Sequence, residues 1–257
     1  MFRRNVSIMS RVLGVIPARL EATRLPRKPL RPICGQPMIA WVYWRARKAR
    51  CLDGLVVATD SEEIAAYCRG NQIPVVITSS AHRSGTDRVV EVMGREPADV
   101  YVDIQGDEPM VTAEHIELLL QPFREVPDTQ VSTLKVAIST EQAQNPNNVK
   151  VVTDLRGRAL YFSRAPIPYD RDGAGRVQYY KHLGLYAYAA EALRQFRDLP
   201  PSRLEQHEKL EQLRFLENGI PITVGETAQD TIGVDTEEDL KVVEECFRRA
   251  GITAPAL

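Results

Sequence analysis

The sequence predicts an α/β fold with a central, mostly parallel sheet and an inserted region of mixed or antiparallel strands. Over the first half of the chain, short β-branched apolar runs alternate with segments of helical periodicity, which is typical of strand–helix–strand units. After residue 130 this alternation stops, and strand-like segments follow one another directly. The 257 residues, 44% hydrophobic and 26% charged, have the composition of an ordinary globular protein.

The first half of the chain supplies the parallel part of the sheet. Four apolar runs are expected as strands, at 11–16, 54–60, 73–78 and 98–105, and three helical segments at 37–50, 61–70 and 86–95. Asp60 is expected to cap the second of these helices, with Glu63 at capping-box spacing. Ligands of such folds bind beyond the carboxyl ends of the strands, so the loops leaving those ends should converge.

The second half supplies the inserted strands and the last helices. Strands are expected at 131–138, 148–154, 158–163 and 181–189, with a hairpin turn at 154–157 and short strands at "PITVGE" and "TIGV". Helices are expected at 202–219, capped by Ser202, and at 235–251, capped by Asp235. We interpret 11–251 as a single domain in which 131–190 is inserted, and 1–10 as a flexible leader with Met9 as an alternative start.

Composition excludes several classes of protein. The net charge of -1 gives no global basic field for nucleic acid. No apolar run approaches the roughly 20 residues that span a bilayer, and no apolar segment follows the N-terminal arginines as in a secretory signal. The four cysteines form no C-x-x-C pair, so we expect reduced thiols in a cytoplasmic protein.

The segment "GVIPARLEATRLPRKPL" (14–30) follows the first strand and must be a loop, because its three prolines disfavour helix and central strand. It contains neither a Walker A motif nor G-x-G-x-x-G. Arg19, Arg24 and Lys28 are four or five residues apart, so they could surround one polyanion such as a phosphate chain. The alternative is a solvated loop of unrelated cations.

Two carboxylates are candidate metal ligands. In "QGDEP" (105–109), Gly106 allows a tight turn, and Asp107 then lies at a strand end where Mg²⁺ shared with substrate phosphates is commonly held. The alternative is an ordinary turn. Asp235 is the second candidate, and its alternative is a helix cap.

The loop "HRSGTDR" (82–88) has residues small enough to let a flat ring approach the backbone. These residues are Ser84, Gly85 and Thr86, and Arg88 could reach a base carbonyl. The alternative is a helix N-cap at Ser84 or Thr86.

Together these stretches resemble the 3-deoxy-manno-octulosonate (Kdo) cytidylyltransferases, or CMP-Kdo synthetases, from about Arg11 to about Glu245. The resemblance rests on nine stretches in order: "IPARLEATRLPRKPL", "VATDSEEI", "HRSGTDR", "QGDEPM", "NPNNVKVV", "ALYFSRAPIPYDR", "YKHLGLYAY", "LEQHEKLEQLRFLENG" and "GVDTEEDL". It implies a Rossmann-like nucleotidyltransferase fold, Mg²⁺ dependence and a homodimer. It implies attack of the anomeric hydroxyl of Kdo on the α-phosphate of CTP, giving CMP-Kdo for lipopolysaccharide synthesis and pyrophosphate.

The resemblance also implies roles for individual residues. Lys28, Arg19 and Asp107 are the expected catalytic residues. The expected nucleotide-binding residues are Arg19, Arg24, Lys28, Ser84, Gly85, Thr86, Arg88 and Gln105. The expected sugar-acid residues are Arg164, His182, Tyr186, Glu211 and Gln212. Asp107 and Asp235 are the expected metal ligands, and Arg27 is left outside the site. The alternatives are activation of another acidic sugar, such as sialic acid or 8-amino-Kdo, and a regulatory nucleotide-binding protein.

Overall fold

The computed structural model describes residues 11–21, 25–82, 84–173 and 175–253 and confirms the α/β class. The chain divides into two compact units, which we describe separately. The parallel unit comprises residues 10–117 and 231–257, and the mixed unit has residues 118–230 as its main segment. The boundaries predicted for a single domain with an insertion at 131–190 stay a prediction.

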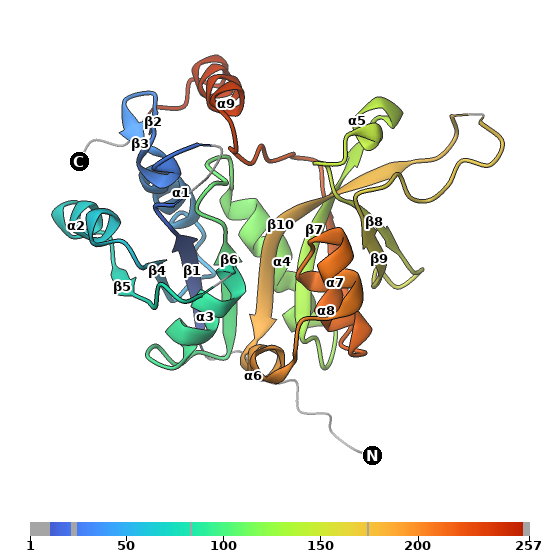
Figure 1. Ribbon diagram of the computed structural model, residues 1–257, viewed down its shortest axis with the longest axis horizontal. Coiled ribbons are helices and arrows are strands. Elements are labelled where there is room, and N and C mark those ends of the chain that lie inside the picture. The colour runs from blue at the N-terminus through green and yellow to red at the C-terminus, as the bar shows by residue number, and fades with distance from the viewer. Residues whose placement is uncertain (1–10, 22–24, 83, 174, 254–257) are drawn as a thin grey trace. The chain divides into compact units, whose positions relative to one another are not determined.

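The sheet of the parallel unit is formed by four parallel strands in the order β6-β1-β4-β5 (Figure 1). They are β1 (Val12–Ala18), β4 (Gly54–Thr59), β5 (Val75–Ile77) and β6 (Val100–Ile104). Every residue of β1 is buried, because its side chains are almost all apolar and a strand pairs with it on either side. The loops that follow these strands therefore leave from one edge of the sheet.

Helices of the parallel unit connect and cover these strands. They are α1 (Met38–Ala46), α2 (Glu62–Gly70), α3 (Gly85–Met93) and α9 (Glu237–Arg249), with the short η1 (Lys28–Leu30), β2 (Pro32–Ile33) and β3 (Gln36–Pro37) ahead of α1. The rings of Trp41 and Phe247 are 4.7 Å apart, and the Trp41 indole donates to the carbonyl of Ile33 at 2.7 Å. The first contact joins α9 to α1, and the second joins α1 to β2.

The described residues of the mixed unit form five strands. They are β7 (Val131–Ile138), β8 (Lys150–Thr153), β9 (Ala159–Ser163), β10 (Tyr179–Ala189) and β11 (Ile222–Thr227). β7 pairs antiparallel with β10 and parallel with β11, whereas β8 pairs antiparallel with both β9 and β10. The change from parallel to mixed strands after residue 130 is therefore as the sequence predicted, including the hairpin turn between β8 and β9.

The helices from residue 113 to residue 219 differ from the prediction. The sequence analysis omitted α4 (Ala113–Glu125), α5 (Thr140–Gln144) and α6 (Ala190–Asp198). The helix expected at 202–219 is two helices, α7 (Arg203–Glu208) and α8 (Gln212–Glu217), because Lys209 has a left-handed φ of 57° and ends the first. "TIGV" forms no strand. Within the described part of the chain, no helix has the length and apolar character required to cross a membrane.

Candidate active site

An ion-pair triad lies at the carboxyl end of the parallel strands. The Lys28 ammonium donates to Asp107 Oδ2 at 2.6 Å and to Asp235 Oδ1 at 2.9 Å. The Lys28 side chain is only 15% exposed, whereas those of the two aspartates are 33% and 46% exposed. Three residues that are far apart in the sequence are thus brought to one point. Phosphate binding by Lys28 and Mg²⁺ binding by the two aspartates stay predictions.

The position of Asp107 follows from the close packing of the residue before it. A Cβ on Gly106 would lie 2.7 Å from the carbonyl oxygen of Pro17, near the end of β1. The Gly106 N–H donates to that same oxygen at 3.2 Å. Only glycine allows this approach, so the loop after β6 rests directly on the end of β1.

Asp235 reaches the triad because it does not cap α9. The cap is Thr236, whose hydroxyl accepts from the Asp239 N–H, while the Asp239 carboxylate accepts from the Thr236 N–H in a capping box. The prediction that Asp235 caps this helix was wrong. The Val234 N–H donates to the Asp107 carbonyl at 2.9 Å, which brings the two aspartates side by side.

The net charge of the triad favours the binding of an additional cation. Burial alone would lower the pKa of Lys28, but Asp107 and then Asp235 outweigh it, so the pKa is raised and the ammonium stays charged. One cation facing two carboxylates leaves a net charge of about -1. Among the described residues no cluster of three or more His, Cys, Asp or Glu side chains could hold a metal. Carboxylate oxygens are ligands that a hard cation such as Mg²⁺ takes, together with water and phosphate oxygens.

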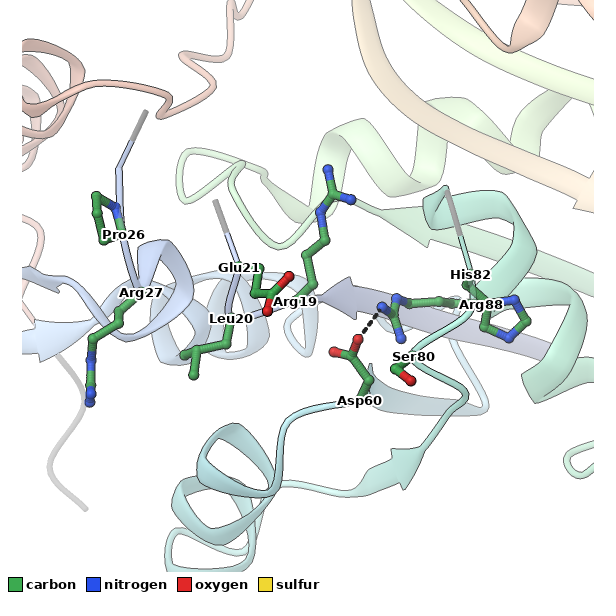
Figure 2. A pocket seen from close by; sticks show the side chains of 9 residues that line it. All are labelled: Arg19, Leu20, Glu21, Pro26, Arg27, Asp60, Ser80, His82 and Arg88. Carbon is green, nitrogen blue, oxygen red and sulfur yellow. Dashed lines mark hydrogen bonds and ion pairs between the residues drawn. The ribbon is translucent and has the colours of Figure 1, made fainter. Parts of the chain in front are cut away.

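A cavity of about 570 Å³ opens in the same unit beside the loop that contains the predicted cations. Its wall includes Arg19, Leu20 and Glu21 after β1, Pro26 and Arg27 before η1, Asp60 after β4, and Ser80, His82 and Arg88 after β5. In Figure 2, Arg19 and Glu21 lie on one side of this space, with Ser80 and His82 on the other. Arg24 lies outside the described residues. Arg27, which the prediction left out, lines the cavity and pairs with Glu63.

An ion pair between the buried Arg88 and the partly buried Asp60 stabilises the wall of the cavity (Figure 2). Arg88 is 3% exposed, and its guanidinium donates to Asp60 Oδ2 at 2.9 Å, Thr78 Oγ1 at 2.7 Å and the Ser79 carbonyl at 3.2 Å. Asp60 is available for this pair because Ser61, not Asp60, caps α2. The structure thus connects the ends of β4 and β5 through Arg88.

The predicted cytidine loop lies at the start of α3. Ser84 caps this helix by accepting from the Asp87 N–H at 3.1 Å, so the alternative of a helix cap is correct for Ser84. Gly85 packs on Gln105, because a Cβ there would lie 3.1 Å from the Gln105 amide nitrogen, and Thr86 is buried. The loops after β5 and β6 therefore meet through two predicted nucleotide-binding residues.

Besides Arg27, six residues of the cavity wall were not predicted as site residues: Leu20, Glu21, Pro26, Asp60, Ser80 and His82. The polar residues among them share a position at the carboxyl ends of predicted strands: Glu21, Ser80 and His82 follow such an end, and Asp60 is the last residue of a predicted strand. Asp60 could have been recognised as a pocket residue only if Ser61 had been preferred as the cap.

The predicted sugar-acid residues lie in the mixed unit. His182 and Tyr186 are both on β10, with ring centroids 5.3 Å apart. Burial lowers the pKa of His182 to about 3, so the ring is neutral at physiological pH. It contacts Thr133 Oγ1 through Nε2 at 3.0 Å. Arg164 is the residue after β9, whereas His182 and Tyr186 lie on the next strand, β10.

The buried side chain of Gln212 is a candidate hydrogen-bond donor to a ligand. Glu211 and Gln212 stand at the start of α8, and Gln212 is 6% exposed. Its Nε2 is buried without a hydrogen-bond partner among the residues described. Because leaving a buried amide unsatisfied is costly, this nitrogen suits an oxygen of a bound ligand.

Comparison with known proteins gives the class first: a model of the cytidylyltransferase family matches residues 13–226. The 3-deoxy-manno-octulosonate cytidylyltransferase of Acidobacterium capsulatum is 59% identical, covering 91% of this chain and 95% of its own. That of Koribacter versatilis is 54% identical, covering 93% and 90%. A solved CMP:2-keto-3-deoxy-manno-octonic acid synthetase complexed with CTP is 44% identical with a TM-score of 0.90, covering 94% of this chain and all of the other. The chain belongs to the cytidylyltransferase family and, within it, to the 3-deoxy-manno-octulosonate cytidylyltransferases.

Proposed function

We propose that the protein transfers CMP from CTP to the anomeric hydroxyl of Kdo, giving CMP-Kdo and pyrophosphate and so activating Kdo for lipopolysaccharide synthesis. The observation that carries the proposal is the Lys28–Asp107–Asp235 triad beside a cation-lined cavity, in a chain 59% identical to a protein named for this reaction.

In the proposed reaction the hydroxyl oxygen of the sugar forms a bond to the α-phosphorus of CTP. The bond from that phosphorus to the oxygen bridging to the β-phosphorus breaks, pyrophosphate leaves with the electron pair, and the hydroxyl proton is released. Such a transfer asks the protein for positioning and for compensation of negative charge. Arg19 and Lys28 supply cations toward the triphosphate, and Asp107 holds the Lys28 ammonium in place.

Asp107 and Asp235 are the residues that would hold Mg²⁺ in this proposal. Their carboxylates already converge on a cation, the Lys28 ammonium, which is the observation that fits the metal to the site. When bound, Mg²⁺ would neutralise phosphate charge and lower the pKa of the attacking hydroxyl.

The sugar acid is assigned to the mixed unit. Arg164 offers a guanidinium for a carboxylate, and the buried Gln212 Nε2 offers a donor for a sugar oxygen. Glu211 and Tyr186 remain proposed neighbours of the sugar. His182 is not the base, because a ring whose pKa is about 3 has almost no affinity for a proton at neutral pH.

The test is pyrophosphate release from a panel of nucleoside triphosphates against Kdo, 8-amino-Kdo and N-acetylneuraminate. We expect turnover with CTP and Kdo, and its loss in Asp107→Asn, which keeps the shape of the side chain. Preference for another acidic sugar would replace the substrate in this proposal. Tight CTP binding without pyrophosphate release from any sugar acid would leave a regulatory nucleotide-binding protein and refute the enzyme.

We also propose that the protein is a cytoplasmic homodimer that pairs through its mixed unit. Leu155, Leu160 and Tyr169 are 107%, 62% and 85% exposed, and they lie on the β8–β9 hairpin and the segment after it. Exposed large apolar side chains on one region favour a protein partner.

All four cysteines are free thiols, which agrees with a reducing compartment. Sedimentation tests the dimer: Leu160→Lys should dissociate it, and a monomeric wild type at micromolar concentration would refute it.

A further inference from the structure

Lys150 is a fully buried lysine in the mixed unit that the proposed mechanism does not use. It lies on β8 and is 0% exposed, and among the described residues its ammonium makes no ion pair at contact distance. Nζ instead donates to two backbone carbonyls, that of Arg164 at 2.7 Å and that of Asn145 at 3.1 Å. A buried lysine without a carboxylate on it is costly, so its two carbonyl contacts call for an explanation.

The two acceptor carbonyls lie at either end of the Arg164 side chain. One is the backbone carbonyl of Arg164 itself, and the other belongs to Asn145, next to the residue that the guanidinium contacts. Arg164 donates through Nη1 to the carbonyl of Pro146, the residue after Asn145, at 3.1 Å. Lys150 therefore ties together the backbone at the base of the Arg164 side chain and the loop that receives its tip. The contacts form a closed ring through Lys150, Arg164 and the 145–146 loop.

Glu208, the last residue of α7, also holds Arg164 in place. Its carboxylate accepts from the Arg164 N–H at 2.9 Å and from Ser163 Oγ at 2.7 Å, and its carbonyl accepts from Arg164 Nε at 2.8 Å. Arg164 Nη2 has no partner within the described part of the chain, so one edge of the guanidinium is left for a ligand. Two cations with one carboxylate leave this cluster positive, which suits an anion.

The electrostatics agree with this arrangement. Burial, followed by the nearby charge of Arg164, lowers the pKa of Lys150, and Glu208 partly offsets them. The surroundings of Lys150 thus disfavour its charged form, while its ammonium makes two hydrogen bonds to backbone carbonyls.

We propose that Lys150 is a positioning residue, which fixes Arg164 so that its guanidinium meets the carboxylate of the sugar acid. Lys150 itself touches no substrate. The inference rests on the proposed function, because it takes the anion to be the acidic sugar substrate.

The experiment is a double-mutant cycle with Lys150→Met, Arg164→Ala and the pair, measuring kcat and the KM of each substrate in pyrophosphate release. Methionine keeps the length of the side chain but removes the donor. We expect Lys150→Met to raise the KM for Kdo by about tenfold or more, the scale of one lost hydrogen bond to a charged group. The KM for CTP should not change. In the Arg164→Ala background, the lysine change should have no further effect on the KM for Kdo.

Val151→Ala is the matched control, because Val151 is the next residue on β8 and 1% exposed. It loses packing, and hence melting temperature, without removing a partner from either carbonyl. If Val151→Ala raises the KM for Kdo as much as Lys150→Met does, Lys150 is merely structural and the inference fails. It also fails if the Lys150→Met effect persists without Arg164, or falls on CTP.

If the methionine variant does not fold, Lys150→Leu, which also removes the donor, takes its place in the cycle, with the same outcomes. Wild-type kinetics come first and separate the two proposals. No turnover with any sugar acid refutes the proposed function, whereas turnover with a Lys150 effect independent of Arg164 refutes only this inference.

Discussion

Replacing Gly106 by alanine tests whether close packing holds Asp107 in place. The added Cβ would lie 2.7 Å from the Pro17 carbonyl oxygen, and ordinary contact begins near 3.4 Å, so the loop after β6 must move by about 0.7 Å. The φ of Gly106 is not in the left-handed region, so the contact and not the backbone conformation opposes alanine. The obstacle is backbone, which cannot rotate aside as a side chain would.

The size of the effect follows from this displacement. Asp107 is the next residue, and its carboxylate lies 2.6 Å from the Lys28 ammonium. Because misplacement by about 1 Å costs roughly a hundredfold in rate, we expect Gly106→Ala to lower turnover by about ten- to a hundredfold. Forcing a methyl into a packed contact should also lower the free energy of unfolding by about 1–3 kcal/mol.

Pyrophosphate release and thermal unfolding measure the two effects. Gly70→Ala is the control, since a Cβ there meets nothing within 4 Å and the residue lies in α2 of the same unit. It should leave turnover unchanged and stability unchanged or up to about 1 kcal/mol higher. Wild-type turnover in a destabilised Gly106→Ala would show that the packing does not position Asp107, and wild-type stability would show that the close approach itself is wrong.

Three further predictions concern the triad and the buried histidine. Lys28→Ala should reduce turnover by roughly a hundredfold or more with little change in the KM for Kdo; a change mainly in that KM, measured by varying each substrate in turn, would contradict the site. Asp235→Asn should lower turnover while keeping the melting temperature, whereas Thr236→Ala, which removes the helix cap, should cost about 1 kcal/mol of stability; the reverse pattern would return Asp235 to a capping role. The pKa of His182 is lowered from 6.5 to about 3, so below pH 6.5 the unfolded chain binds a proton that the folded protein does not. Stability should therefore fall by about 2 kcal/mol between pH 7 and pH 5 in the wild type, and by less in His182→Asn, in denaturant titrations at both pH values.

The convergence of the site was predictable because parallel strands all end at one edge of a sheet. Asp107 could be assigned to that edge from its place after an apolar strand, and it does lie there with Lys28. What the sequence could not supply is which of two adjacent polar residues caps a helix. Asp60 precedes Ser61, and Asp235 precedes Thr236, and Asp, Ser and Thr all cap helices well. In both cases the second residue caps, and the aspartate is left for an ion pair.

The break between α7 and α8 shows a second reason why the sequence did not predict the local structure. The capping box at Ser202 and the stop at Gly219 were both recognisable, and the apolar periodicity continues between them. The helix nevertheless ends at Lys209, in a left-handed conformation that lysine rarely adopts. The buried pair of Arg214 with Glu205 joins the two short helices across the break, so tertiary contacts decide the local conformation.

The parallel unit is discontinuous, and this sets an order of events on the ribosome. Residues 10–117 are made first and 231–257 only after the mixed unit, so Lys28 and Asp107 exist before Asp235 is translated. At about 5–20 residues per second, the intervening segment takes on the order of ten seconds to synthesise. During that time the nascent chain holds an incomplete triad. The triad is therefore completed last, by the segment that leaves the ribosome last, and chains that end before residue 235 lack its second carboxylate.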